Sequence, residues 1–327
     1  MRAPQKEDGV AMSDLDFTPH DTEPEPLLAP EQTLPQVVQN ADAPAELFQS
    51  WSQPEVVLPT RTPHLGHLAL LVAFLLLGFL CMTVSILVAV HFHFDGVTAL
   101  DRIKTNVHYI LGGEAVLYLV TLALSFSIFP LIWNRSFLAG IHWRGATALR
   151  LRWWLFAIAG GCIVLAMIDD WLLPGPKNAP IDDMFRSPGA AWMMFGFGIT
   201  FAPFFEEIGF RGFLLPALAT AWDWVTERST GKPASPLDAN EHPQWSISSM
   251  VAASIATSLP FALMHAEQTG WAPGPFVLLM SVSLILCAVR LKTRSLAAST
   301  LVHACYNFII FSFALISSGG FRHLDKM

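Results

Sequence analysis

Residues 68–90 read LALLVAFLLLGFLCMTVSILVAV, and no Asp, Glu, Lys or Arg lies between Arg61 and Asp95. An α-helix needs roughly 20 consecutive apolar residues to cross the hydrocarbon core of a bilayer. This run is long enough, and it carries none of the charges that would hold a helix in water. We therefore expect a transmembrane helix here.

Six further apolar segments follow along the chain. The one near 188–220 is too long for a plain crossing, and we expect Pro203 and Pro216 to kink it, or to divide it into a span and a shorter re-entrant or interfacial helix. The sequence thus predicts an all-α, polytopic integral membrane helix bundle of about seven or eight transmembrane helices. The six segments lie near residues 109–133, 151–172, 188–220, 247–266, 274–291 and 295–318.

The composition of the whole chain agrees with a membrane protein. Of 327 residues, 53% are hydrophobic and 14% are charged, whereas soluble domains carry about 25% charged residues. The chain has no basic patch of the kind that binds nucleic acid, so we expect no nucleic-acid partner. The four cysteines all fall inside apolar segments, and their spacing matches neither a disulfide framework nor a zinc motif. This composition argues against an ordinary soluble enzyme.

The first 63 residues differ in character from the rest. They contain ten of the 23 prolines, and eleven Asp or Glu against three Lys or Arg. Such a segment cannot bury enough apolar surface to offset its conformational entropy. We therefore expect residues 1–63 to be a disordered, acidic, Pro-rich tail and residues 64–320 to be a transmembrane helical domain, with the first apolar run serving as the signal anchor.

The distribution of basic residues between the loops predicts the orientation of the protein. With seven spans, the near tail, the 134–152 and 221–245 loops and the 290–294 turn share one side and hold ten Lys or Arg, while the other side holds six. Because cytoplasmic loops carry an excess of basic residues, we expect the N-terminus in the cytoplasm.

Two carboxylates and one guanidinium lie inside the fourth apolar segment, in the sequence EEIGFR at residues 206–211. An ionisable side chain in hydrocarbon costs at least about 2.5–3.5 kcal/mol on insertion scales. On a helix Glu207 and Arg211 share a face and can pair, whereas Glu206 points about 100° away. Glu206 therefore suits a general base that takes a proton from water. The alternative is a helix-locking salt bridge, with Glu206 facing a polar loop.

Two further polar groups occupy later apolar segments. His265 ends the fifth segment, four residues after Phe261. His303 and Asn307 lie one helical turn apart in the last segment, which is free of charged residues. Taken singly, His265 is typical of an interfacial residue, and the His303–Asn307 pair is typical of an interhelical hydrogen-bond clamp.

Considered together, the three groups indicate hydrolysis. A carboxylate and a histidine can activate water, and a histidine with an amide can hold the oxyanion that forms on the attacked carbonyl. Because the groups lie on three different spans, they can meet in one polar cavity inside the bundle. Such a site needs no Ser or Cys nucleophile.

At these residues the sequence resembles the CPBP family, named for CAAX proteases and bacteriocin-processing enzymes. The family pattern is Glu-Glu-x-x-x-Arg, then Phe-x-x-x-His, then His-x-x-x-Asn, and all three occur here in that order. The resemblance covers about residues 188–310 and implies a protease core in that part of the chain. The matching positions are Glu206, Glu207 and Arg211, then Phe261 and His265, then His303 and Asn307.

The resemblance also implies roles for these residues. Glu206 corresponds to the water-activating carboxylate, which His265 assists. His303 and Asn307 correspond to the pair that stabilises the oxyanion. The positions with a structural or supporting part are Glu207, Arg211 and Phe261.

The resemblance leaves the metal dependence open, because members have been described both as metalloproteases and as metal-independent glutamate proteases. Glu206, His265 and His303 match the ligand types of a three-ligand zinc site. The chain has no His-Glu-x-x-His zinc motif, however. We therefore favour a reaction without a metal or other cofactor and keep zinc as the alternative.

Three other classes of function match parts of the sequence less well. Pro216-Ala217-Leu218 is similar to a motif of presenilin-type aspartyl proteases, but their two membrane Asp motifs are missing. A transporter or channel that uses the polar residues as a proton relay would show internal repeats, and the sequence has none. A non-proteolytic scaffold or bacteriocin-immunity-like protein is the main alternative, although such a protein has little need for four polar residues in lipid.

These observations predict an intramembrane endopeptidase that hydrolyses a peptide bond of a membrane-associated or lipidated peptide. Its partners would be that peptide or lipidated protein substrate and the lipid bilayer. We expect it in a bacterial plasma (inner) membrane because of the abundance of bacterial members in the family.

Overall fold

The computed structural model describes residues 61–93, 106–176, 179–185, 187–233, 237–238 and 243–323. The predicted disordered tail lies outside these residues, apart from its last three positions. Within the described part of the chain, regular secondary structure is helical, with one isolated β-bridge between Leu237 and Pro243.

Seven helices in the described residues are long and apolar enough to cross a membrane, which confirms the all-α membrane bundle. Each predicted apolar segment corresponds to one of them. They are α2 (Leu65–His91), α3 (Val107–Trp133), α6 (Arg152–Leu172), a composite helix (Pro188–Thr230), α10 (Ile247–Met264), α11 (Pro273–Thr293) and α12 (Leu296–Ser317). The connections contain the short helices α4 (Phe137–Gly140), α5 (Gly145–Arg150) and η3 (Pro180–Phe185).

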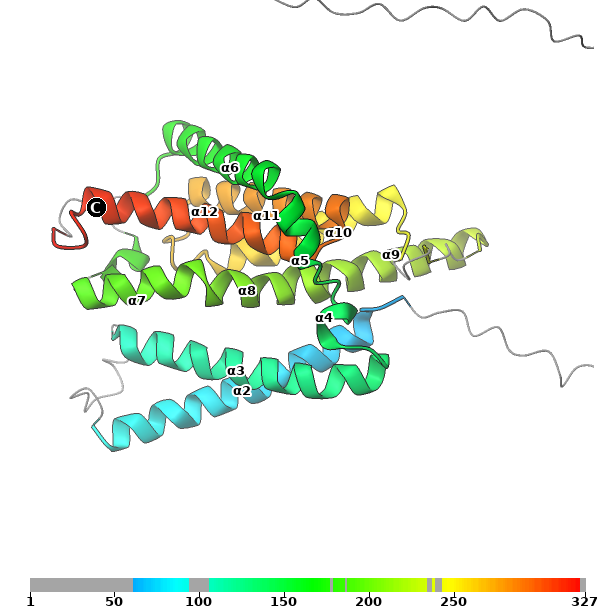
Figure 1. Cartoon of the computed structure of the whole chain (residues 1–327), viewed down its shortest axis with the longest axis horizontal. Coiled ribbons are helices and arrows are strands. Elements are labelled where there is room, and N and C mark those ends of the chain that lie inside the picture. Colours follow the sequence, from blue (N-terminus) through cyan, green and yellow to red (C-terminus); the bar gives the residue numbers. More distant parts are fainter. Residues whose placement is uncertain are drawn as a thin grey trace, which may run out of the picture. The chain divides into compact units, whose positions relative to one another are not determined.

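The composite helix is interrupted near Pro203, the first of the two prolines that were expected to kink it. Thr200 breaks the regular geometry with φ −122° and ψ −76°, because Pro203 has no N–H to donate to the carbonyl of Ile199. The pieces nevertheless follow one another in one direction, without a separate re-entrant helix (Figure 1). They are α7 (Pro188–Ile199), α8 (Phe201–Glu207), the π-helical segment η4 (Ile208–Leu214) and α9 (Leu215–Thr230).

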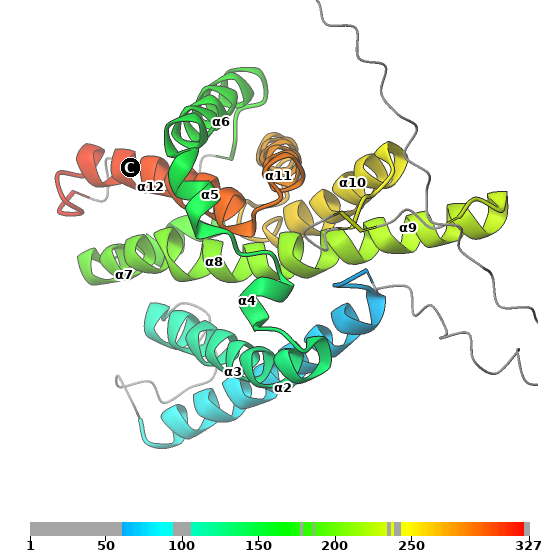
Figure 2. The ribbon, with the colours of Figure 1, turned by 45° about the vertical axis from the view of Figure 1, so that its right-hand side comes forward.

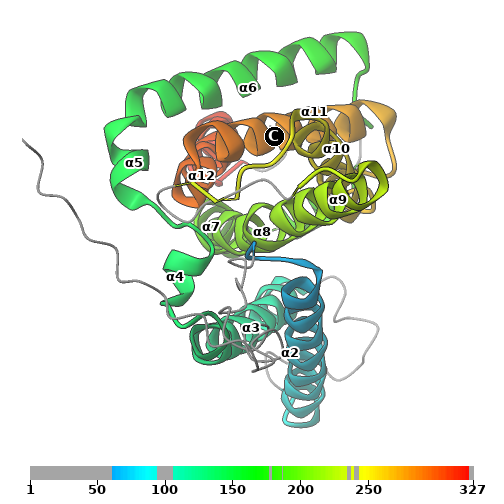
Figure 3. The same cartoon turned by 90° about the vertical axis from the view of Figure 1, so that its right-hand side faces the viewer.

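The helices are arranged on two sides of the composite helix. Helices α10, α11 and α12 lie along one side of it, and the paired helices α2 and α3 lie along the other (Figures 2 and 3). Helix α6 covers α11 and α12 from outside, and α2 contacts η4 and α9. The three motifs, on α8 with η4, at the end of α10 and on α12, are therefore enclosed by other helices.

Two apolar clusters hold these layers together. One joins α2 and α3 to η4, and its buried members include Leu71, Phe74, Phe129 and Phe213. The other joins α6 to α11 and α12, and its buried members include Leu155, Ala159, Leu286 and Val302. Many other apolar side chains face outward, such as Leu131 at 79% exposure and Ile316 at 76%. An outer surface of this kind is expected where lipid, rather than water, covers the helices.

Five polar contacts join four segments at one end of the bundle. The segments are the end of the tail at Arg61 and the three basic connections, residues 134–152, 221–245 and 290–294. These are the same four segments that share one side in the count of basic residues. The contacts are Arg61 with Glu227, Thr62 with Arg135, His142 with Leu296, Arg144 with Ser295, and Asp238 with Arg294.

Candidate active site

Glu206 lies near the end of α8, at a point where two histidines from other spans approach it. Its Oε1 is 4.0 Å from Nε2 of His265, and its Oε2 is 3.8 Å from Nε2 of His303. Oε2 is buried and has no hydrogen-bond partner among the described residues. The carboxylate and the two imidazoles thus meet from three separate spans.

The orientation of His265 follows from the way in which α10 ends. The backbone N–H of His265 donates to the carbonyl of Ala262, which leaves the carbonyl of Phe261 to accept from Nδ1 of the His265 ring at 2.9 Å. The last carbonyls of a helix have no partner within the helix, and this ring supplies one. Because a carbonyl only accepts, Nδ1 carries the ring proton, and Nε2 of the neutral ring faces Glu206 unprotonated.

His303 is held in the same way, but by a carboxylate. Its Nδ1 lies 3.2 Å from Oε1 of Glu207, and an ionised carboxylate only accepts hydrogen bonds. The ring proton of neutral His303 therefore also lies on Nδ1, and the unprotonated Nε2 faces Glu206.

The gap between these groups has the chemistry of a water site. The Glu206 carboxylate lies 3.8–4.0 Å from the Nε2 atom of each imidazole, which is too far for direct hydrogen bonds. A water molecule between them would donate one hydrogen to Glu206 and the other to an imidazole. The arrangement can therefore hold and deprotonate water inside the bundle.

Glu207 and Arg211 form a fully buried ion pair behind the site. Nη1 of Arg211 donates to Oε1 of Glu207 at 2.9 Å. Its Nη2 donates to the side chain of Ser283 on α11 at 2.6 Å and to the Ser283 carbonyl at 3.2 Å. The predicted pairing is thus present, although the chain is π-helical from Ile208 onward. Pairs buried to this degree depend on such extra hydrogen bonds to offset desolvation.

The ring of Phe261 forms a wall that all three motifs touch. It is almost completely buried, and the guanidinium carbon of Arg211 lies 4.5 Å from its centre. The imidazole centres of His265 and His303 lie 5.0 and 5.8 Å from it. Phe261 therefore packs against the Arg211 guanidinium and both imidazoles, and it limits the freedom of the two rings to rotate.

Asn307 lies one turn beyond His303 on α12. Its side chain is held by a backbone carbonyl of α7, next to the irregular backbone at Thr200. Its Nδ2 donates to the carbonyl of Gly198 at 2.8 Å, in the last turn of α7 before the break. A Cβ at Gly198 would come within 2.7 Å of the Phe311 ring, so glycine lets α7 and α12 approach closely. Asn307 is thus joined to the site through His303 and α12.

Two residues outside the three sequence motifs, Glu114 and Tyr118, also lie beside Glu206. The carboxylate of Glu114 on α3 interacts electrostatically with that of Glu206. Tyr118, one turn further, stacks on Phe205, with ring centres 3.9 Å apart and planes at 19°. The signal for Glu114 was present, because it is the only Asp, Glu, Lys or Arg in α3, and such a residue in a span indicates a functional position.

Glu206, His265 and His303 supply part of the donor set of a zinc site. Two imidazole nitrogens and one carboxylate are ligands that zinc accepts, and each Nδ1 is held by an acceptor, as in known zinc sites. However, no group of three or more His, Cys, Asp or Glu within the described ranges is placed to hold a metal ion. We therefore route no step of the reaction through a metal.

Taken together, the bundle and its polar centre define an integral membrane protein with an enclosed carboxylate–imidazole site. Residues 188–309 match the family model described as Type II CAAX prenyl endopeptidase Rce1-like. The match confirms the resemblance that the three motifs indicated. Comparisons with curated proteins and with solved structures found no match.

Proposed function

We propose that this protein is an intramembrane endopeptidase that hydrolyses a peptide bond with water activated by Glu206. The observation that carries the proposal is the convergence of this carboxylate with the Nε2 atoms of His265 and His303. The match of residues 188–309 to a protease family supports it.

In the first step, a water molecule held between Glu206 and His265 attacks the carbonyl carbon of the scissile bond. Glu206 takes a proton from the water as the new C–O bond forms, and the carbonyl oxygen becomes an oxyanion. The tetrahedral intermediate then collapses and the C–N bond breaks. Protonated Glu206 returns its proton to the leaving amine, so the carboxylate is regenerated.

His303 and Asn307 stabilise the oxyanion in this proposal. One N–H of Asn307 is used on the carbonyl of Gly198, and its second N–H is left to donate. His303 already donates from Nδ1 to Glu207, so its Nε2 can donate only from an imidazolium. The carboxylate of Glu207 lies beside the ring to balance that charge. Donors fixed in advance in a site that excludes water are among the largest contributions to catalysis.

The proposed substrate is a membrane-associated or lipidated peptide that enters the bundle from the bilayer. The description of the matching family makes a C-terminal CAAX peptide with a prenyl group the first candidate to test. We also propose that the protein lies in a bacterial plasma membrane, on the basis of family abundance, with its N-terminus in the cytoplasm, on the basis of its basic connections.

The test is cleavage of a peptide library, with prenylated CAAX peptides included, by the full-length protein purified in detergent. Glu206→Gln removes the base but keeps the shape of the side chain, so we expect the cleavage rate to fall by more than about 100-fold. Glu267→Gln makes the same change on an exposed acid two residues after His265 and should leave the rate unchanged. Normal cleavage by Glu206→Gln would contradict the assignment of the base.

A strong zinc chelator separates the metal-free reaction from a zinc enzyme. We expect wild-type cleavage to persist in the chelator, with a zinc content well below one equivalent per chain. Loss of cleavage in the chelator, restored by added zinc, would instead make Glu206, His265 and His303 metal ligands.

A further inference from the structure

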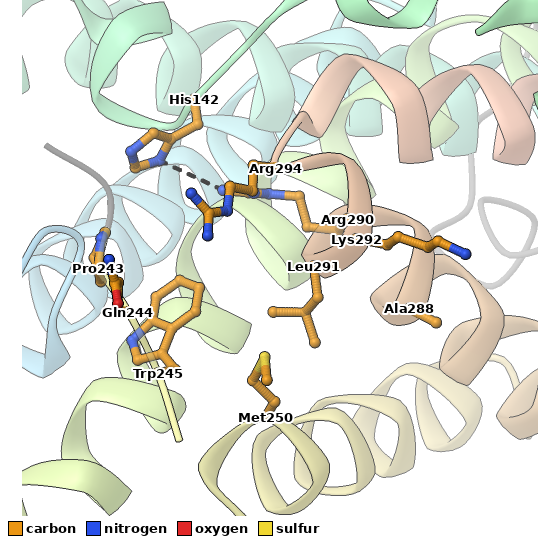
Figure 4. A pocket seen from close by; sticks show the side chains of 10 residues that line it. All are labelled: His142, Pro243, Gln244, Trp245, Met250, Ala288, Arg290, Leu291, Lys292 and Arg294. Atoms are coloured by element: carbon orange, nitrogen blue, oxygen red, sulfur yellow. Dashed lines mark hydrogen bonds between the residues drawn. The ribbon is translucent and has the colours of Figure 1, made fainter. Parts of the chain in front are cut away.

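A cavity of about 580 Å³ lies at the end of the bundle where the basic connections meet. This volume is within the usual range for small-molecule sites, about 300–1,000 Å³. Its walls come from the connection between α4 and α5, from residues 243–245, from α10 and from the C-terminal part of α11 (Figure 4). None of the lining residues is acidic, and three of them are arginine or lysine.

Arg290 is the buried cation of this cavity, with 4% of its surface exposed. Its Nη2 lies 3.5 Å from Nδ1 of His142, and its Nε has no hydrogen-bond partner among the described residues. The ion pairs found in the same part of the chain do not include Arg290. A buried guanidinium with an unfilled N–H is costly unless an acceptor binds it, and an anion is the strongest acceptor.

Acidic side chains around the cavity are engaged with other groups. Asp238 pairs with Arg294 at the rim. Asp223 accepts hydrogen bonds from Ser246 and Ser249. The Glu207 carboxylate acts on Arg290 electrostatically, but its ion pair is with Arg211. Three cations and no acidic side chain line the cavity, which favours an anionic ligand from outside the chain.

The lining also includes the polar side chains of His142 and Gln244, and the apolar side chains of Pro243, Trp245, Met250, Ala288 and Leu291. Figure 4 shows Arg290 extended toward His142, with Trp245, Leu291 and Met250 across the space. A ligand that fills this cavity therefore carries its negative charge at one end and an apolar part at the other.

The position of the cavity matches the headgroup level of a bilayer. Tryptophan rings gather at the boundary between lipid and water, and four exposed tryptophans lie on the helices at this end of the bundle. Phosphates of membrane lipids are abundant at the same depth, and basic pockets between transmembrane helices bind such headgroups. The four residues are Trp153, Trp154, Trp222 and Trp224.

The lining of the cavity does not include Glu206, although Arg290 interacts electrostatically with the neighbouring Glu207. On α11, Ser283 contacts the buried Arg211 of that site, and Arg290 lies seven residues further along. Seven residues of α-helix correspond to about 10.5 Å. A ligand at Arg290 would therefore bind the end of α11 that lies at the membrane surface. It would not reach the proposed catalytic carboxylate, Glu206.

We propose that this cavity binds a phosphate group, supplied by an anionic phospholipid of the surrounding leaflet. The phosphate is bound by the guanidinium of Arg290, while the glycerol and the first acyl carbons contact Trp245, Met250 and Leu291. A guanidinium suits this role because its planar donors match phosphate oxygens in pairs. This proposal does not depend on whether the protein cleaves peptides.

The test measures the melting temperature of the full-length protein, purified in an uncharged detergent and stripped of lipid. Phosphatidylglycerol, phosphatidylcholine and inorganic phosphate are titrated separately, because a ligand that binds only the folded state raises the melting temperature. We expect a saturable rise with phosphatidylglycerol and none with phosphatidylcholine. Arg290→Gln should weaken the apparent affinity for phosphatidylglycerol about tenfold or more.

Two other variants complete the design. Arg150→Gln removes an exposed arginine of α5 at the same end of the bundle and should keep the full response. Met250→Trp keeps every charge but fills the cavity, so it should abolish the response even if Arg290→Gln does not fold. An equal rise with phosphatidylcholine, or an unchanged response in both cavity variants, would overturn the proposal. A full response to inorganic phosphate alone would keep the phosphate site and overturn its assignment to a lipid.

Discussion

At the scale of single residues, removal of Arg211 would take a hydrogen-bond donor away from two other buried side chains. Arg211 donates to Glu207 and to Ser283, and all of its surface is buried. Arg211→Ala would leave the Glu207 carboxylate buried without its ion-pair partner, and breaking a buried pair costs about 3–5 kcal/mol. That is a large part of the total stability of a domain, about 5–15 kcal/mol.

We therefore expect Arg211→Ala to lower the yield of monodisperse protein and its melting temperature. Arg228→Ala, at an exposed arginine of α9, is the matched control and should behave like the wild type. Arg211→Lys keeps the charge, but an ammonium group lacks the planar set of donors that lets a guanidinium bind two partners at once. This variant should therefore recover only part of the lost yield and melting temperature. Equal yields and melting temperatures for all three variants would show that the ion pair does not support the fold.

The sequence predicted part of this site for a clear physical reason. Residues four apart share a helix face, so the pairing of Glu207 with Arg211 followed from spacing alone. The bond from Arg211 to Ser283 and the bond from Asn307 to Gly198 did not follow, because they depend on how separate helices pack. The ring orientations of the two histidines also depend on such partners, a helix-end carbonyl in one case and a carboxylate in the other.

At the scale of helices, apolar runs predicted the seven spans because the thickness of the bilayer sets their length. They did not predict the π-helical segment at Ile208–Leu214, which leaves no mark on hydropathy. The apolar run of the fourth segment stops near residue 220, whereas the helix continues to Thr230. Its last turns are polar, so they carry no membrane signal.

The contact between α2 and α3 offers a test at this scale. A Cβ at Gly78 would come within 2.9 Å of the backbone carbonyl of Leu117 and of Oγ1 of Thr121. Backbone atoms cannot move aside cheaply, so Gly78→Ala should lower stability by about 1–3 kcal/mol through overpacking. Gly112→Ala, on α3 with no atom within 4 Å of the new Cβ, is the control. A thermal melt that does not distinguish the two variants would argue against this close approach.

At the scale of the whole molecule, the contacts at one end of the bundle support a single prediction about orientation. The near tail and three basic connections meet there, and these segments hold ten Lys or Arg against six on the other side. An odd number of spans carries the chain from that end to the opposite end, where α12 finishes at Ser317. The positive-inside rule therefore places Lys232 in the cytoplasm and Arg322 outside.

Single cysteines test this orientation after the four native cysteines, which lie within helices, are replaced by alanine. We expect Arg322→Cys to react with a membrane-impermeant thiol reagent in intact cells, and Lys232→Cys to react only after the membrane is opened. Both positions are exposed, so a difference in labelling reports sidedness rather than burial. The reverse pattern would place the N-terminus outside, and with it the cavity at Arg290. Labelling of both sites in intact cells would require an even number of spans between them.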